Sequence, residues 1–138
     1  MDERQIFITE YDLKRLREVI IEQKRVNKEG REYIESLELE LERGNVVPSK
    51  DVPPNVVTMN SQVRVEDLEI GDDMVFTLVF PDEADHAQSK VSVLAPLGTA
   101  VLGYRVGDVI RWKVPAGVRE FRVKEIIYQP EASGDYHL

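Results

Sequence analysis

The carboxylates best placed for metal chemistry are Glu29 and Glu32, three residues apart in a polar bend between two stretches of helical periodicity. Paired carboxylates supply the hard oxygen ligands that Mg²⁺ prefers. The same bend also holds four basic residues: Lys24, Arg25, Lys28 and Arg31. Because their positive charge weakens any divalent-cation site, the sequence favours a solvated helix end over a metal centre.

Other residue types that commonly carry chemistry are scarce. No cysteine occurs in the 138 residues, which excludes disulfides, thiolate nucleophiles and zinc–thiolate sites. The two histidines, His86 and His137, do not stand at a metal-ligand spacing, and no glycine-rich loop of the Walker type is present. The sequence therefore predicts no catalytic residue, no metal and no cofactor.

The charge balance bears on the kind of partner. The formal net charge is −8, whereas nucleic-acid-binding domains carry basic patches that neutralise phosphates. We therefore expect a protein partner and no direct sequence-specific contact with nucleic acid. No apolar run approaches the roughly 18 residues of a membrane span, and the N-terminus lacks a signal-peptide pattern. A cytoplasmic monomer without membrane contact is expected.

Residues 10–43 are predicted to form two short helices. Thr9 is a candidate N-cap, with Asp12 three residues later in a capping-box-like arrangement. An apolar stripe marks each helix: Leu13, Leu16, Val19 and Ile20 in the first, and Tyr33, Ile34, Leu37 and Leu41 in the second. Joined by the polar segment Val26–Gly30, the helices are expected to pair as an antiparallel hairpin. Leu39 lies off the stripe, so part of the hairpin base is expected to pack against the second half of the chain.

The stretch 44–58 contains three prolines. Proline disfavours helix and discourages a central strand, so this stretch is predicted to be a linker. The resulting organisation is a helical hairpin over residues 1–44, a linker over 45–58 and a C-terminal domain over 59–138.

The C-terminal part has the pattern of a sheet. Alternating or β-branched runs predict strands at 62–65, 74–80, 91–94, 109–114 and 119–128. Pro81–Lys90 is predicted to be a loop, and Pro96 can begin a short helix that Gly103 ends. Short, closely spaced strands with one short helix predict an α+β protein, in which a bent antiparallel sheet half-wraps around that helix.

A set of glycines, prolines and small residues in the stretch VSVLAPLGTAVLGYRVGDVIRWKVPAG forms a specific motif: Ser92, Val93, Ala95, Pro96, Gly98, Ala100, Leu102, Gly103, Val106, Gly107 and Asp108, then Pro115 and Gly117. This motif resembles the C-terminal domain of the Gre transcript cleavage factors. The loop PDEAD resembles their acidic loop, and the likeness covers roughly residues 56–128. The full length, the short helical arms and the segments VVTMNSQVR and YQPEASGDYHL resemble more closely the regulator of nucleoside diphosphate kinase (Rnk) family, a member of the same superfamily.

The resemblance implies an FK506-binding-protein-like (FKBP-like) fold for the C-terminal domain and a short coiled coil for the helices. It also implies docking on RNA polymerase at the rim of the secondary channel, in competition with Gre-type factors. The candidate contacts lie at the helical tip, in the acidic loop and beside the motif: Lys24, Arg25, Lys28, Glu29, Arg31 and Glu32; Asp82, Glu83 and Asp85; and Tyr104 and Arg105.

Other functions stay open. Gre-like transcript cleavage is disfavoured, because the tip motif N-G-D-L-x-E-N-A is absent and an arm of about 16 residues rises only about 24 Å. Peptidyl-prolyl isomerase activity would need an apolar cleft, for which the candidate lining residues are Phe76, Phe80, Tyr104, Trp112 and Phe121. An effect on nucleoside diphosphate kinase levels is more simply placed at transcription than at kinase chemistry. We therefore expect a non-catalytic transcription regulator.

Overall fold

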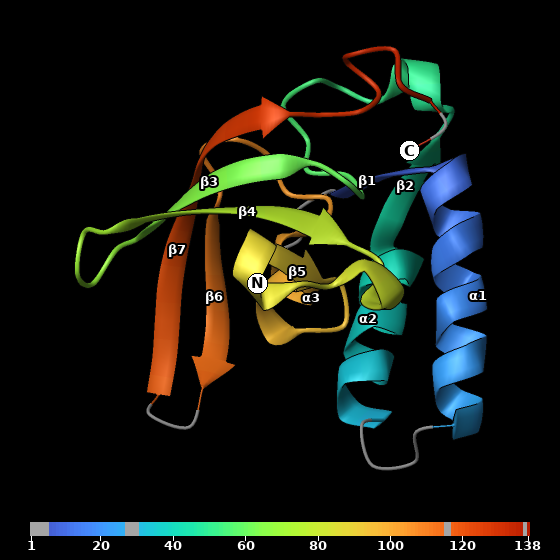
Figure 1. The fold of residues 1–138 in the computed structure, drawn as a ribbon, viewed down its shortest axis with the longest axis horizontal. Coiled ribbons are helices and arrows are strands. Elements are labelled where there is room, and N and C mark those ends of the chain that lie inside the picture. The colour runs from blue at the N-terminus through green and yellow to red at the C-terminus, as the bar shows by residue number, and fades with distance from the viewer. Residues whose placement is uncertain (1–5, 27–30, 115–116, 137) are drawn as a thin grey trace.

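The computed structural model describes residues 6–26, 31–114, 117–136 and 138, which form an α+β protein (Figure 1). The helices of this part are α1 (Glu10–Val26), α2 (Arg31–Arg43) and α3 (Pro96–Val101). Its strands are β1 (Ile6–Thr9), β2 (Gly44–Val47), β3 (Gln62–Asp67), β4 (Asp73–Val79), β5 (Lys90–Ser92), β6 (Val109–Val114) and β7 (Gly117–Tyr128). Short 3₁₀ turns are η1 (Ser49–Asp51), η2 (Pro81–Glu83) and η3 (His86–Gln88). The predicted order of a helical part followed by a sheet is confirmed.

Helices α1 and α2 lie side by side and run in opposite directions (Figure 1). The predicted N-cap is confirmed, because the Asp12 N–H donates to Thr9 Oγ1 at 3.0 Å. The predicted stripes supply buried residues on both helices: Leu13, Leu16, Ile20, Ile34, Leu37 and Leu41. Val19 is partly buried against them. Residues 27–30 of the predicted connection and the Tyr33 side chain lie outside what the structure describes. Helix α2 contacts α3, so part of the helix pair packs against the second half of the chain as expected, although Leu39 itself is 61% exposed.

A small parallel sheet closes the base of the helix pair. β1 pairs with β2 in the register Ile6↔Gly44 to Thr9↔Val47. Sequence patterning did not predict either strand, since both are only four residues long and each lacks a second neighbour. The first residues of the proposed linker are therefore ordered as a strand. The boundary at 45–58 stays a prediction.

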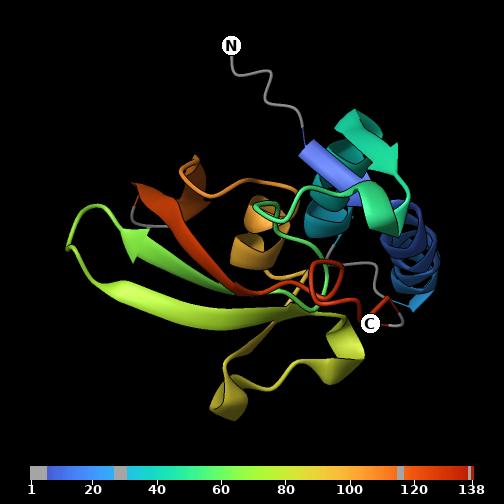
Figure 2. The same ribbon diagram turned by 90° about the horizontal axis from the view of Figure 1, so that it is seen from above.

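The main sheet has five strands in the order β5-β4-β3-β7-β6. β3 pairs antiparallel with both β4 and β7, and β6 pairs antiparallel with β7. Two register shifts between β3 and β7 mark bulges, which increase twist and bend the strands. Figure 2 shows the sheet curving around α3, with the helix pair beyond it.

The prediction of a wholly antiparallel sheet is wrong at one edge, where β4 and β5 are parallel. The intervening loop crosses through η2 and η3 before β5 begins, so the chain re-enters the sheet in the direction of β4. Parallel neighbours require such a crossover, whereas antiparallel ones can be joined by a tight turn. The polar composition of Pro81–Lys90 indicated a loop but not the direction in which it returns.

The glycines of the family motif have structural roles around α3. A Cβ atom on Gly98 would lie 2.2 Å from the carbonyl oxygen of Ser92, so only glycine lets α3 approach β5 this closely. Thr99 Oγ1 donates to the Val93 carbonyl at 2.6 Å and fastens the same contact. Gly103 follows the helix with a φ of +83°, which confirms the predicted stop.

One hydrophobic cluster joins the helix pair to the sheet. Its members include Leu16 and Leu37 of the helices as well as Phe76 and Val101 around the sheet. α3 contacts α2 on one side and β5 and β6 on the other, so it bridges the two parts. Within the described ranges, no helix is long and apolar enough to cross a membrane.

Candidate functional site

The helical tip presents basic residues that are already paired with glutamates. Lys24 Nζ lies 2.7 Å from Glu38 Oε1 on the facing helix, and Arg25 Nη2 lies 3.0 Å from Glu22 Oε2 one turn earlier. Both basic side chains remain exposed. Lys28 and Glu29 lie outside the described residues, as do the side chains of Arg31 and Glu32. The described part of the chain contains no group of three or more acidic or histidine side chains that could hold a metal ion.

The acidic loop separates into structural and accessible carboxylates. Asp85 is the N-cap of η3, because its Oδ1 accepts the Ala87 N–H at 3.0 Å. Asp82 and Glu83 are exposed in η2, and neither forms an ion pair within the described residues. Glu83 also lines a pocket of about 300 Å³ with Lys90 and other side chains. Asp82 and Glu83 can therefore meet a partner without first breaking a contact.

Arg105 fastens the N-terminal strand to the motif, beside Tyr104. The Arg105 guanidinium lies over the Phe7 ring at 5.0 Å from its centroid. The Arg105 N–H donates to Asp108 Oδ2 at 2.9 Å, and Tyr104 packs half-buried against the core. Part of the Arg105 side chain remains accessible, but the structural contacts of this pair are sufficient to explain its residue types.

Three of the five aromatic residues considered for an isomerase cleft lie in the core. Phe76, Phe80 and Phe121 are 1%, 7% and 5% exposed, so they fill the interior and do not line an open cleft. The Trp112 side chain lies outside the described ones. These three buried rings therefore do not favour the isomerase alternative.

A buried polar junction joins α1 to the sheet, and sequence reasoning did not identify it. Asp12 Oδ2 accepts the Met59 N–H at 3.1 Å, and Asp12 Oδ1 accepts a 2.6 Å hydrogen bond from Arg15 Nη2. The Arg15 guanidinium lies 3.9 Å from the Tyr11 ring centroid and 4.6 Å from that of Phe80. The only sequence sign was an aspartate at the third position of a capped helix.

The environment of Asp12 shifts its titration. Burial raises the pKa of the carboxyl to about 6, although the hydrogen bonds from Met59 and Arg15 act in the opposite direction. The charge of nearby Glu131 adds to the rise. This junction is a structural link between the two parts, and its charge state is sensitive to mildly acidic pH.

The C-terminal segment folds back onto this junction. Thr58 Oγ1 donates to Glu131 Oε1 at 2.7 Å, and Arg15 Nη2 donates to the Leu138 carbonyl at 2.6 Å. The Tyr128 hydroxyl donates to Asp135, and this bond raises the pKa of Tyr128 to about 12. These contacts hold the described residues of the tail against the rest of the chain. His137 is outside them.

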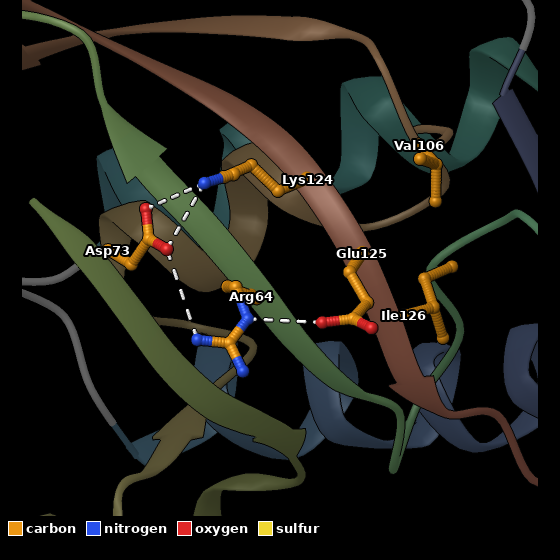
Figure 3. A pocket seen from close by; sticks show the side chains of 6 residues that line it. All are labelled: Arg64, Asp73, Val106, Lys124, Glu125 and Ile126. Atoms are coloured by element: carbon orange, nitrogen blue, oxygen red, sulfur yellow. Dashed lines mark hydrogen bonds and ion pairs between the residues drawn. The ribbon is translucent and has the colours of Figure 1, made fainter. Parts of the chain in front are cut away.

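A shallow cleft of about 660 Å³ lies on the face of the sheet opposite the core (Figure 3). Arg64 in its centre lies 3.1 Å from Glu125 and 3.9 Å from Asp73. Lys124 lies 3.2 Å from the same aspartate. Because these four charges neutralise one another, the cleft offers little excess charge to a ligand.

Comparison with known proteins adds a family to this geometry. Residues 52–128 match the family described as "Transcription elongation factor, GreA/GreB, C-term", and residues 4–47 match "Rnk N-terminus". The "Regulator of nucleoside diphosphate kinase" of Escherichia coli K12 is 40% identical over 134 residues, which cover 96% of each chain. The chain belongs to the Rnk family.

Two further relatives place this Rnk-family protein beside the elongation factors. A solved structure titled "Prokaryotic transcription elongation factor GreA/GreB from Nitrosomonas europaea" is 37% identical, with a TM-score of 0.72 over 91% of this chain and 99% of that one. The "Transcription elongation factor GreA" of Acetivibrio thermocellus is 36% identical over 71% of this chain but only 60% of its own length. The Rnk-family chain thus has a GreA/GreB-like fold, and the predicted family is confirmed.

Proposed function

We propose that this Rnk-family protein is a non-catalytic transcription regulator that binds RNA polymerase near the rim of its secondary channel, as a monomer. Its sheet domain, of FKBP-like type, supplies the main docking surface, and α1 and α2 act as a short coiled coil. The observation that carries the proposal is the match of residues 52–128 to the GreA/GreB C-terminal family. The name of the Nitrosomonas structural neighbour, an elongation factor, supports the same class.

The dimensions of the helix pair support a non-catalytic role. The 17 residues of α1 rise about 26 Å at about 1.5 Å per residue. The A. thermocellus GreA aligns over only 60% of its length, so it is the longer chain. The helix pair is short, and the basic residues near its tip, Lys24 and Arg25, are paired with glutamates. Such a tip suits occupation of a channel entrance better than delivery of a metal ion to a catalytic centre.

The proposed contact residues lie on three accessible segments. Lys24 and Arg25 stand near the tip, Asp82 and Glu83 on η2, and Arg105 beside the motif. Since the exposed Lys24–Glu38 and Arg25–Glu22 pairs contribute little to stability, a partner can exchange them at small cost.

The relationship to nucleoside diphosphate kinase enters through the name of the E. coli relative. For this chain we place any such effect at transcription of the kinase gene. Competition with Gre-type factors for the same polymerase surface is the regulatory mechanism proposed.

The test is equilibrium binding of the labelled full chain to core RNA polymerase, followed by competition with unlabelled GreA. We expect saturable binding and displacement by GreA. A variant lacking residues 24–32 should bind more weakly but not lose binding, because the sheet domain still docks. Absence of binding by the folded wild-type chain would remove the proposal.

A further inference from the structure

A groove runs between α1 and α2 on one face of the helix pair. Its volume is about 290 Å³, and it is lined by Arg17, Ile20, Ile21, Glu38, Leu41 and Glu42. Ile20 and Leu41 are 5% and 7% exposed and form an apolar floor. Ile21 stands beside that floor and is 69% exposed, the largest value among the exposed apolar side chains of the described residues.

The two walls of the groove carry opposite charge. Arg17 belongs to α1, whereas Glu38 and Glu42 belong to α2. Lys24 holds Glu38 at 2.7 Å, but neither Arg17 nor Glu42 has an ion-pair partner within the described part of the chain. The helices as a whole share this asymmetry, with four acids and five bases in α1 against five acids and two bases in α2.

A single exposed isoleucine on a surface needs no explanation. Here the exposed side chain adjoins an apolar floor and lies between walls of opposite sign. An amphipathic helix binds such a groove with apolar anchors at i, i+3 or i+4, and its flanking charges choose the orientation. A partner helix would need acidic side chains toward α1 and basic side chains toward α2.

We propose that this groove, centred on Ile21, binds one amphipathic helix of RNA polymerase whose flanking charges complement Arg17 and Glu42. The inference rests on the proposed function, because it names the surface by which the helix pair engages the polymerase. The sides of the pair thus contribute to binding in addition to the tip.

The experiment measures the binding of two variants to core polymerase, each with one apolar residue replaced by glutamate. Ile21→Glu places a carboxylate in the groove, whereas Leu39→Glu makes an equivalent change at a 61% exposed residue that does not line the groove. Both positions are exposed, so both variants should keep the wild-type circular dichroism and melting temperature. We expect Ile21→Glu to raise Kd at least ~10-fold and Leu39→Glu to leave it within about two-fold.

Charge reversal tests the orientation. Glu42→Lys should weaken binding about 3- to 10-fold, mainly through a slower association rate that is sensitive to salt. Its control is Glu18→Lys, an exposed acid on α1 that does not line the groove and has no ion pair with another described residue. Equal losses from both reversals would show a general charge effect and contradict the proposed orientation.

The failures of the two proposals are distinguishable. If wild-type protein binds polymerase and Ile21→Glu binds equally well, the groove inference is overturned and the proposed function stands. If wild-type protein does not bind, both fall. Sedimentation of the wild-type chain alone tests whether a second copy of the chain occupies the groove. A dimer that Ile21→Glu dissociates would assign the groove to that second copy and overturn the proposal.

Discussion

Asp12 links two parts of the molecule through one carboxylate, which is 1% exposed and accepts hydrogen bonds from the Met59 N–H and from Arg15. Burial penalises the charged carboxylate, and the two hydrogen bonds compensate for part of that penalty. They do so only while α1 keeps Asp12 within reach of both donors. The residue therefore fixes how α1 sits against the chain before β3.

The pH dependence of stability should reveal this carboxylate. Its folded pKa of about 6 lies above the unfolded value of about 3.9, so the folded state binds the extra proton between these values. The protonated carboxyl therefore contributes stability that is complete below about pH 4 and is lost as pH rises through about 6. The free energy of unfolding should fall by about 3 kcal/mol over this range. Urea unfolding of wild type and Asp12→Asn at several pH values between 4 and 7 measures it. The difference between the two proteins should change across this range, and a constant difference would contradict the assignment.

The Lys24–Glu38 pair should contribute little to folding. Its side chains are 43% and 34% exposed, so solvent screens the attraction between them. A double-mutant cycle with Lys24→Ala and Glu38→Ala is expected to give a coupling of about 0.5 kcal/mol. A coupling above about 2 kcal/mol would mean that the pair holds the tip rigid, and Lys24 would then be unavailable to a partner.

At the scale of elements, the sequence predicted what depends on local patterning. Thr9 caps α1 and Gly103 follows α3 because capping and positive φ are chosen by neighbouring residues. The apolar stripes identified the facing sides of α1 and α2 for the same reason. Partners far apart in the chain were not predicted: the Asp12–Met59 bond spans 47 residues, and the parallel pairing of β4 with β5 depends on the path of a polar loop.

The candidate site was predicted as a set of segments and not as a geometry. Asp82 and Glu83 are accessible as expected, whereas Asp85 serves as a cap and Arg105 stacks on Phe7. Residue type alone could not separate these roles, because an aspartate that caps a turn and one that meets a partner look the same in a sequence. The groove beside Ile21 was missed, since it requires the relative placement of two helices.

The contact of α3 with β5 can be tested through Gly98. Helix propensity alone would favour alanine over glycine by about 1 kcal/mol. In the structure an added Cβ lies 2.2 Å from the Ser92 carbonyl oxygen, which is backbone and cannot move aside cheaply. Gly98→Ala should therefore lower the free energy of unfolding by about 2–3 kcal/mol. Denaturant unfolding that shows unchanged or greater stability would refute this close approach.

At the scale of the whole molecule, the helix pair and the sheet share one hydrophobic cluster. This cluster holds α1 and α2 in a fixed position relative to the sheet. The C-terminal segment reinforces it, because Glu131 and Leu138 bond to Thr58 and Arg15. A polymerase ligand of this shape would present the sheet domain and the helix pair together. Binding of one part to the polymerase would therefore fix the position of the other part. The family match and the short helix pair thus support one account, in which the protein occupies the entrance of the polymerase channel and catalyses no reaction there.

Transcript cleavage in halted elongation complexes tests that account most directly. Purified polymerase halted on a labelled transcript is supplied with GreA, and this chain is then added at increasing concentration. The account predicts that the chain alone causes no cleavage and that it suppresses GreA-stimulated cleavage as it displaces GreA. Metal-dependent cleavage stimulated by this chain alone, and lost in Glu29→Gln/Glu32→Gln, would contradict it.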